Sequence, residues 1–189
     1  MRCLLCEDIS FFHICLKCQK LFLTPKIYKK KLECGIDVIS LYKYEDIAPL
    51  LHTKHTDVGF YIYKIMAKNS FYFFAKYFEY NGVQISSLAI DDNPNENYSH
   101  TAILNSYLKS KYIKPIYNIL RVTNKVNYSG QSREFRKNNP RQFSYNEFEN
   151  STCIIVDDIV TTGFTLCEAY EKLKENNKDV LFCLVLAHI

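Results

Sequence analysis

The sequence has no uninterrupted apolar run of about 18 residues or more, and it has no tryptophan. The first absence argues against a transmembrane helix, which needs about 20 consecutive, mostly apolar residues. The first eight residues, MRCLLCED, also lack the pattern of a secretory signal peptide. We therefore expect a cytoplasmic protein, whose eight cysteines would be metal ligands or buried thiols rather than disulfides.

The composition is that of a globular protein. Hydrophobic residues make up 48% of the 189 residues and aromatic residues 15%, which is enough apolar material for a core and excludes a disordered chain. The length suits one principal domain with a small module. Because the net charge of +4 is modest, the positions of the charges are more informative than their sum.

The most informative stretch is Thr152 to Thr165, TCIIVDDIVTTGFT. Its apolar start, residues 153–156, is typical of a buried strand of a parallel sheet. A helical face follows at Leu166, Ala169, Tyr170 and Leu173. The loop between strand and helix presents backbone N–H groups and threonine hydroxyls around Gly163, which is an arrangement suited to a phosphate.

Two adjacent carboxylates, Asp157 and Asp158, lie at the carboxyl end of this strand, where doubly wound α/β proteins bind ligands. Carboxylates in this position can accept hydrogen bonds from sugar hydroxyls or face a hydrated magnesium ion. The alternative is an ordinary strand-to-helix turn, because an aspartate near a helix N-terminus is favourable without any ligand.

The segment VDDIVTTGFT resembles the phosphoribosyl-pyrophosphate motif of type I phosphoribosyltransferases. The resemblance implies a phosphoribosyltransferase-like α/β fold and a site for phosphoribosyl pyrophosphate with magnesium. In that site Asp157 and Asp158 would bind the ribose hydroxyls. The 5′-phosphate would be wrapped by Thr161, Thr162, Gly163, Phe164 and Thr165.

A separate motif lies at the N-terminus, where the spacing C-x2-C-x8-C-x2-C is formed by Cys3, Cys6, Cys15 and Cys18. Two such pairs can complete a closed four-thiolate site, which is typical of structural zinc. The alternatives are four free cysteines, or His13 in place of one thiolate. We predict a zinc-binding module over residues 1–33 and a phosphoribosyltransferase-like domain over residues 34–189, joined by a tether that contains three consecutive lysines.

Periodic patterns elsewhere predict alternating strands and helices. Alternation of this kind favours a parallel sheet with helices on both faces. We expect strands over 36–44, 83–90, 115–121 and 179–188, and helices over 44–51, 58–78 and from Ser99 to Leu108. Cys153, Cys167 and Cys183 fall on predicted buried faces as small apolar residues, while the pattern gives Cys34 no clear role.

A basic segment over residues 109–141 carries nine lysines and arginines and one acid, Glu134. Aromatic residues are interleaved with the cations, as in proteins that bind single-stranded nucleic acid. The alternatives are a cover that closes over pyrophosphate and a solubilising loop. The candidate nucleic-acid contacts are Arg121, Lys125, Arg133, Arg136, Lys137 and Arg141.

The order of a cysteine module, LRVTNKVNYSGQSREFRKNNPRQF and the phosphate motif resembles the ComF family of DNA-uptake competence proteins. The resemblance implies a natural-transformation protein that handles single-stranded DNA in the cytoplasm and meets competence proteins at the cytoplasmic side of the membrane. A peripheral place at the inner membrane is an alternative location. The alternative function is an active phosphoribosyltransferase that acts on a base or related acceptor.

The same resemblance assigns Lys54 and His55 to the loop that binds pyrophosphate. Two departures from the family pattern stand out. Residues 85–90 read ISSLAI where the family has Val-Pro-Val-Pro, and residues 97–100 read NYSH where it has Arg-Gly-Phe-Asn-Gln. For transfer to a base, Tyr98 and His100 are the candidates for a base-binding hood.

Overall fold

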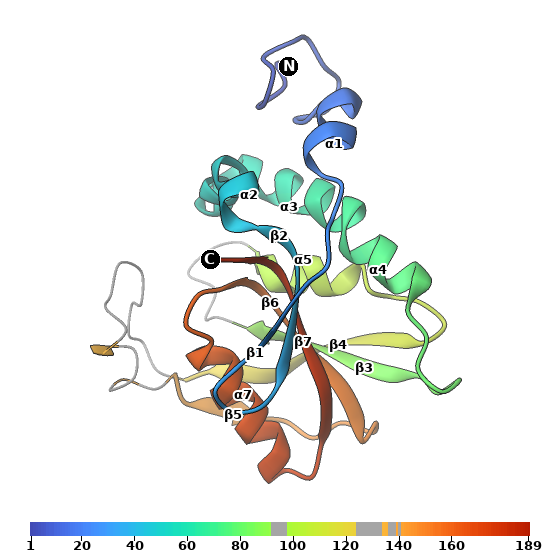
Figure 1. The fold of residues 1–189 in the computed structure, drawn as a ribbon, viewed down its shortest axis with the longest axis vertical. Coiled ribbons are helices and arrows are strands. Elements are labelled where there is room, and N and C mark those ends of the chain that lie inside the picture. Colours follow the sequence, from blue (N-terminus) through green and yellow to red (C-terminus); the bar gives the residue numbers. More distant parts are fainter. Residues whose placement is uncertain (92–97, 124–133, 136–138, 140) are drawn as a thin grey trace.

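The computed structural model describes residues 1–91, 98–123, 134–135, 139 and 141–189. Within these ranges the chain forms a seven-stranded sheet in the order β1-β2-β7-β6-β3-β4-β5 (Figure 1). The strands are β1 (Tyr28–Lys31), β2 (Asp37–Lys43), β3 (Ile85–Asp91), β4 (Ile113–Val122), β5 (Phe143–Tyr145), β6 (Thr152–Val160) and β7 (Asp179–His188).

The five central strands of the sheet are parallel, as predicted, and the two edge strands are antiparallel to their neighbours. The sequence analysis missed both edge strands. Strand β1 has the sequence YKKK and shows no alternation of apolar and polar residues, because its three lysines are all exposed. Lysines on an edge strand discourage pairing with another chain, so a strand of this kind carries little hydrophobic signal.

Helices cover both faces of the sheet (Figure 1). The helices are α1 (Leu16–Phe22), α2 (Tyr44–Leu51), α3 (Asp57–Asn69), α4 (Phe71–Tyr77), α5 (His100–Ser106) and α7 (Phe164–Glu175), with a 3-10 turn, η1 (His52–His55). Helix α3 begins where the Thr56 hydroxyl accepts the Gly59 N–H, and Ser99 caps α5 in the same way. The predicted α/β fold class, a parallel sheet with flanking helices, is confirmed.

Successive side chains of β6 and β7 point to opposite faces of the sheet, so a hydrophobic core forms on each face. Residues 154, 156, 184 and 186 pack with α2, α3, α4 and α5, and residues 153, 155, 183 and 185 pack with α7. All eight side chains are fully buried, which is why these strands read as continuous apolar runs. The last residues of β6 therefore emerge at the sheet edge between the helices of the two faces.

The N-terminal cysteine segment packs against helix α3. Ile14 and Leu23 belong to the same buried cluster as Ile62 of α3, and the Gln19 side chain accepts a hydrogen bond of 3.0 Å from Asn69. Strand β1, which lies within the predicted module of residues 1–33, pairs with β2 as part of the main sheet. The module and the main sheet therefore share strand β1 and one core.

The expectation that cysteines outside the zinc motif are free thiols is wrong for two of them. Cys34, in the turn between β1 and β2, forms a disulfide with Cys167 of α7, and the two Cα atoms lie 5.7 Å apart. Cys153 and Cys183 are buried free thiols, as expected. None of the helices that the structure describes is long and apolar enough to span a bilayer.

Candidate functional site

A cavity of about 120 Å³ lies at the carboxyl edge of the sheet. Its lining comes from the end of β6, the following loop and the start of α7, joined by residues distant in the sequence. The lining residues are Lys54, Ile90, Arg141, Asp157, Asp158, Ile159, Val160, Thr161, Thr162, Gly163, Phe164, Thr165, Leu166 and Glu168. The structure thus brings together both predicted carboxylates, the predicted phosphate loop and the predicted pyrophosphate-loop lysine.

Gly163 shapes the loop of residues 161–165. Its φ is +81°, a left-handed conformation that glycine adopts without strain, and it is the N-cap of α7. A Cβ atom at this position would lie 2.6 Å from Cδ2 of Leu32, so the loop packs directly on the β1–β2 turn. No side chain caps the N-terminus of the 12-residue helix α7, and the positive end of the helix dipole there favours an anion.

The two carboxylates have different surroundings. Successive strand residues alternate between faces, so Asp158 shares the face of Ile154 and Val156, beneath α3 and α5, and Asp157 shares the α7 face. Asp157 is half-buried, and its Oδ1 accepts the Asp158 N–H at 2.8 Å. Asp158 is 7% exposed, and its Oδ1 accepts the Ile159 N–H at 2.8 Å.

Lys54 of η1 forms an ion pair with Asp158, with 2.5 Å between Nζ and Oδ2. Burial on its own would raise the pKa of Asp158, but the Lys54 ammonium and the hydrogen bond from Ile159 outweigh burial and hold this pKa below its usual value. Nearby, burial and then the charge of Asp158 raise the pKa of Tyr63, whose ring is fully buried. Asp158 is therefore ionised and paired at neutral pH.

The backbone of Lys54 is held by two residues that the sequence analysis considered for a base-binding hood. His100 donates a hydrogen bond from Nε2 to the Lys54 carbonyl oxygen. The Tyr98 hydroxyl lies 3.1 Å from the same oxygen and 2.9 Å from the carbonyl oxygen of Thr56. Both side chains thus contact the loop that carries Lys54, and neither lines the cavity.

Arg141 is the one predicted nucleic-acid contact that lies at the cavity among the described residues. Its backbone N–H donates to Oε2 of Glu168 at 2.7 Å, which fixes the end of the basic segment to the first turns of α7. Partial burial raises the pKa of Glu168, although N–H groups of Arg141 and Gln142 act in the opposite direction. Sequence analysis missed Glu168, although it lies one helical turn beyond Thr165.

Of the other predicted nucleic-acid contacts, the structure describes Arg121, which is not part of the cavity lining. Arg121 is exposed on β4 and donates to Oδ1 of Asn118 at 2.6 Å. Lys125, Arg133, Arg136 and Lys137 lie outside the residues that the structure describes. For His55 the structure places the backbone, in η1, and does not describe the side chain.

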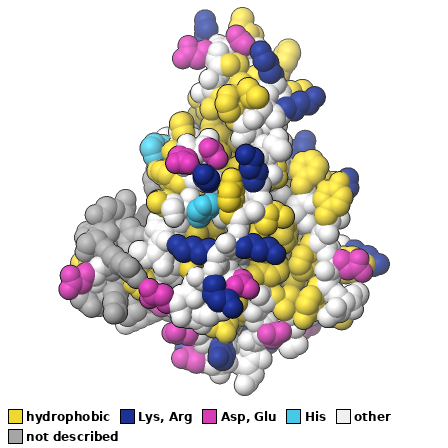
Figure 2. Space-filling view, viewed as in Figure 1, with side chains coloured by type: hydrophobic (Ala, Val, Ile, Leu, Met, Phe, Trp, Pro, Cys, Tyr) yellow, Lys and Arg dark blue, Asp and Glu magenta, His cyan; other side chains and the backbone are white. Residues whose placement is uncertain are grey.

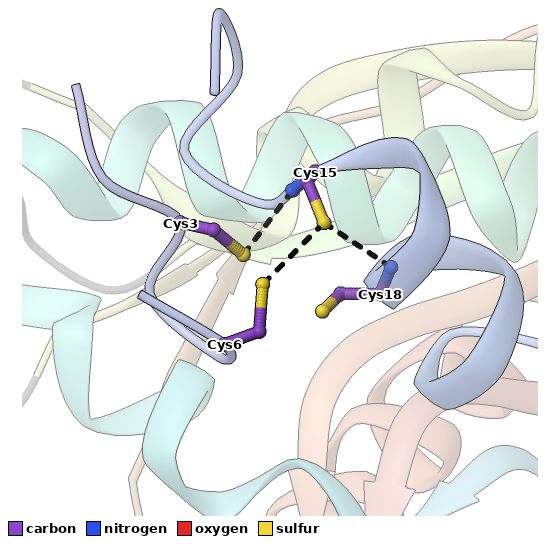
Figure 3. Close-up of side chains that lie close together, drawn as sticks. All are labelled: Cys3, Cys6, Cys15 and Cys18. Carbon is purple, nitrogen blue, oxygen red and sulfur yellow. Dashed lines mark hydrogen bonds between the residues drawn. The ribbon is translucent and has the colours of Figure 1, made fainter. Parts of the chain in front are cut away.

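The four cysteines of the N-terminal motif converge, as Figure 3 shows. Their sulfur atoms all lie within 4.8 Å of one another, and the Cys6 and Cys15 sulfurs are 3.7 Å apart. Tetrahedral zinc with bonds of about 2.3 Å places its sulfur ligands about 3.8 Å apart, so the cluster fits zinc. Backbone N–H groups of Cys15 and Cys18 donate to sulfur atoms of Cys3 and Cys15, respectively. The ring of His13 instead packs against Tyr61, with 5.1 Å between the ring centroids.

Comparison with known proteins gives a family match that covers most of the cavity lining. No curated protein sequence shows a significant match to the chain. Among solved structures, the chain is similar to the crystal structure of orotate phosphoribosyltransferase from Aeropyrum pernix, with 14% identity, coverage of 91% of this chain and 80% of that chain, and a TM-score of 0.41. The family model of the phosphoribosyl transferase domain matches residues 106–188. The chain therefore carries a phosphoribosyltransferase-type domain that includes the strand, loop and helix of the cavity.

Proposed function

We propose that the cavity binds magnesium–phosphoribosyl pyrophosphate, and that the protein is a ComF-type DNA-uptake protein with this ligand site. The observation that carries the ligand proposal is the convergence of the 161–165 loop, two carboxylates and Lys54 on one cavity. These groups match the three parts of the ligand. The loop suits the 5′-phosphate, the carboxylates suit the ribose hydroxyls or a magnesium ion, and a lysine suits the pyrophosphate.

Binding can be tested by thermal and urea unfolding with and without the ligand. Phosphoribosyl pyrophosphate with magnesium at 100 times its dissociation constant should raise the free energy of unfolding by about 2.7 kcal/mol. The Thr162→Val variant, which removes a hydroxyl from the loop, should need more ligand for the same shift. Thr152→Val, at the first residue of the strand that precedes the loop, is the matched control and should respond like the wild type. A wild type that shows no ligand-dependent shift would exclude the site.

The DNA-uptake part of the proposal draws support from a basic surface near the cysteine module. Residues 16–31 contain six lysines and no acidic residue, and Leu16, Leu21 and Phe22 are exposed among them. In Figure 2, Lys and Arg side chains lie on the module and further down this face of the molecule, with some Asp and Glu side chains between them. Lysines bind phosphates, and exposed aromatic rings can stack on unpaired bases. With the basic segment ahead of the phosphate motif, this surface suits single-stranded DNA.

The DNA proposal is tested by measuring the affinity for a single-stranded oligonucleotide at several salt concentrations. If phosphates are the main contacts, the affinity should fall steeply with salt, with a slope of about −0.7 for each phosphate neutralised. Charge reversal at Lys29 and Lys30 tests the surface, and charge reversal at Arg133 and Arg136 tests the basic segment. Lys172→Glu, on the outer face of α7, is the matched control. Unchanged affinity in both double variants would refute the proposal.

A second candidate function is phosphoribosyl transfer to a base or related acceptor, favoured by the match of residues 106–188 to the phosphoribosyl transferase domain. In such a reaction the bond between the anomeric carbon and pyrophosphate breaks while a bond to the acceptor forms. Release of pyrophosphate on addition of bases and magnesium measures it directly. Tight ligand binding without pyrophosphate release for any common base would leave a binding protein rather than a transferase.

A further inference from the structure

We propose that Tyr98 and His100 are positioning residues for Lys54. They hold its backbone still, so that its ammonium group can move between Asp158 and the pyrophosphate of the bound ligand. This inference rests on the proposed phosphoribosyl-pyrophosphate site and assigns a role to two residues outside the cavity. It also explains why the segment at residues 98–100 lies so close to η1.

The Lys54 carbonyl oxygen is the point at which the two residues act. A carbonyl oxygen has two lone pairs and can accept two hydrogen bonds. The Lys54 carbonyl oxygen has two such partners, His100 Nε2 and the Tyr98 hydroxyl at 3.1 Å. Because a carbonyl can only accept, both groups must act as donors, and the single Tyr98 hydroxyl hydrogen is shared between the Lys54 carbonyl and the Thr56 carbonyl at 2.9 Å. The backbone of η1 is thereby fixed on both sides of residue 55.

The first turn of α3 leaves room for this contact only because residue 59 is glycine. A Cβ atom on Gly59 would lie 2.2 Å from the Thr53 carbonyl oxygen and 2.6 Å from the Tyr98 hydroxyl. The φ of Gly59 is not in the left-handed region, so the glycine serves close approach rather than an unusual turn. Gly59 therefore allows η1, Tyr98 and α3 to meet at one place.

Packing against neighbouring aromatic rings holds both positioning residues in place. His100 is 7% exposed, and its ring lies between those of Tyr63 and Tyr98, with 4.7 Å between centroids in both pairs. Tyr98 packs edge-on against Phe60 at 5.5 Å. Ser99 caps α5 between them, which fixes the backbone that carries both side chains.

A fixed backbone confines any movement of Lys54 to its side chain. In the structure its ammonium lies 2.5 Å from Oδ2 of Asp158, and the Lys54 side chain is 26% exposed at the cavity. A lysine has a flexible four-carbon stem, so the ammonium can turn to an anion while the Cα stays in place. A magnesium-bound ligand at the carboxylates would compensate the charge of Asp158 and release Lys54 to the pyrophosphate.

The test compares phosphoribosyl pyrophosphate with ribose 5-phosphate, which has no pyrophosphate for Lys54 to contact. Both dissociation constants are measured by calorimetry in the presence of magnesium, for the wild type and for Tyr98→Phe, His100→Leu and His100→Gln. Loss of one neutral hydrogen bond corresponds to about 3- to 10-fold weaker binding. We expect Tyr98→Phe and His100→Leu to lose this affinity for phosphoribosyl pyrophosphate, while their affinity for ribose 5-phosphate stays within about twofold. His100→Gln keeps an N–H donor and should restore part of the affinity.

A double-mutant cycle supplies the control. Once Lys54→Met has removed the ammonium, Tyr98→Phe should cause no further loss of phosphoribosyl-pyrophosphate affinity. The inference is overturned if the Tyr98 and His100 variants lose as much affinity for ribose 5-phosphate as for phosphoribosyl pyrophosphate. It is also overturned if Tyr98→Phe costs the same affinity in the Lys54→Met background as in the wild type, because either result would show a merely structural role. No loss in either variant would also overturn it. If the wild type binds neither ligand, it is the proposed site that fails.

Discussion

At the scale of single residues, Gly163 is held by two constraints at once. Its φ of +81° disfavours any side chain, and the space that a Cβ would occupy is filled by Leu32. We predict that Gly163→Ala lowers the free energy of unfolding by about 2–4 kcal/mol, from about 1–2 kcal/mol of backbone strain and a further cost of overpacking. The variant should also bind phosphoribosyl ligands more weakly, because the loop must shift away from Leu32.

Gly82 provides the matched control for this substitution. Its φ is +69°, also left-handed, but a Cβ atom there would have no heavy atom within 4 Å. Gly82→Ala should therefore show only the backbone cost, about 1–2 kcal/mol in urea unfolding, and normal ligand binding. Equal effects of the two substitutions would mean that the contact with Leu32 does not shape the loop.

Asp158 should make the stability of the protein depend on pH in the acid range. Its folded-state pKa lies below the ordinary value, so the paired carboxylate stabilises the fold above about pH 4, and this contribution is lost as pH falls through the folded-state pKa. At neutral pH, Asp158→Asn should cost about 1–3 kcal/mol, less than a fully buried pair, because the Lys54 side chain is 26% exposed.

Urea unfolding at neutral pH and at steps below about pH 4 measures this effect. The difference between wild type and Asp158→Asn should narrow as the solution is acidified, since the wild-type carboxyl then takes up a proton. Asparagine keeps the side-chain oxygen that accepts the Ile159 N–H, so the variant isolates the charge. A difference that stays constant down to low pH would contradict the ion-pair interpretation.

At the scale of elements, the Cys34–Cys167 disulfide connects the β1–β2 turn to α7. The two cysteines are 133 residues apart in the chain, and a closed loop of that size stabilises the fold by about 4–5 kcal/mol in the chain-entropy description. We predict that a phosphine reductant lowers the free energy of unfolding of the wild type by several kcal/mol, to the level of Cys34→Ser/Cys167→Ser. Urea unfolding with and without reductant measures the change.

The double serine variant is also the control, because its response to the reductant reports only the other six cysteines. If wild type and double variant lose the same stability on reduction, the disulfide makes no contribution in solution. Because Cys167 donates its N–H to the Gly163 carbonyl at 2.9 Å, a loosened bridge should also weaken binding at the phosphate loop.

The elements themselves were predictable where burial dictates the pattern. The buried strands β6 and β7 and the periodic helices α3 and α7 have strong hydrophobic signals, so the sequence indicates them directly. Edge strand β1 was missed because its side chains are largely solvent-exposed, and β5 was missed because three residues are too few to show a periodic pattern. The disulfide was missed for a related reason, since no local pattern shows that residues 34 and 167 meet.

Within the candidate site, the contiguous motif of residues 157–165 could be predicted from the sequence. The contacts between segments that are distant in the sequence could be predicted only in part. The 157–165 stretch appears in the sequence as a unit, and the resemblance to a known family added Lys54. The contacts that Tyr98 and His100 make with the Lys54 carbonyl depend on how α5 and η1 pack against each other, which sequence spacing does not encode. The structure assigns these residues to the Lys54 loop rather than to the cavity wall.

At the scale of the whole molecule, helix α3 connects the cysteine module to the Lys54 loop. One side of α3 packs against Ile14 and Leu23 of the N-terminal segment, and its first turn contacts η1 through Gly59. Two of the four zinc-motif cysteines, Cys3 and Cys18, are buried in the same cluster. A change in the module can therefore reach the cavity through a continuous set of packed side chains.

We predict that loss of zinc weakens binding of phosphoribosyl pyrophosphate more than binding of ribose 5-phosphate. Structural zinc stabilises the segment that holds it, so Cys15→Ser should lose the metal, disorder residues 1–23 and remove support from α3, while the pairing of β1 with β2 keeps Leu32 in place. Lys54 depends on α3, whereas the phosphate loop rests on Leu32 on the α7 side of the sheet. The affinity for phosphoribosyl pyrophosphate should fall about fivefold or more, and metal analysis with calorimetry on both ligands measures it. Phe11→Ser, at a side chain that is 97% exposed on the same module, is the control and should keep both zinc and affinity. If Cys15→Ser lacks zinc but binds both ligands normally, the module and the cavity are independent, and α3 transmits nothing between them.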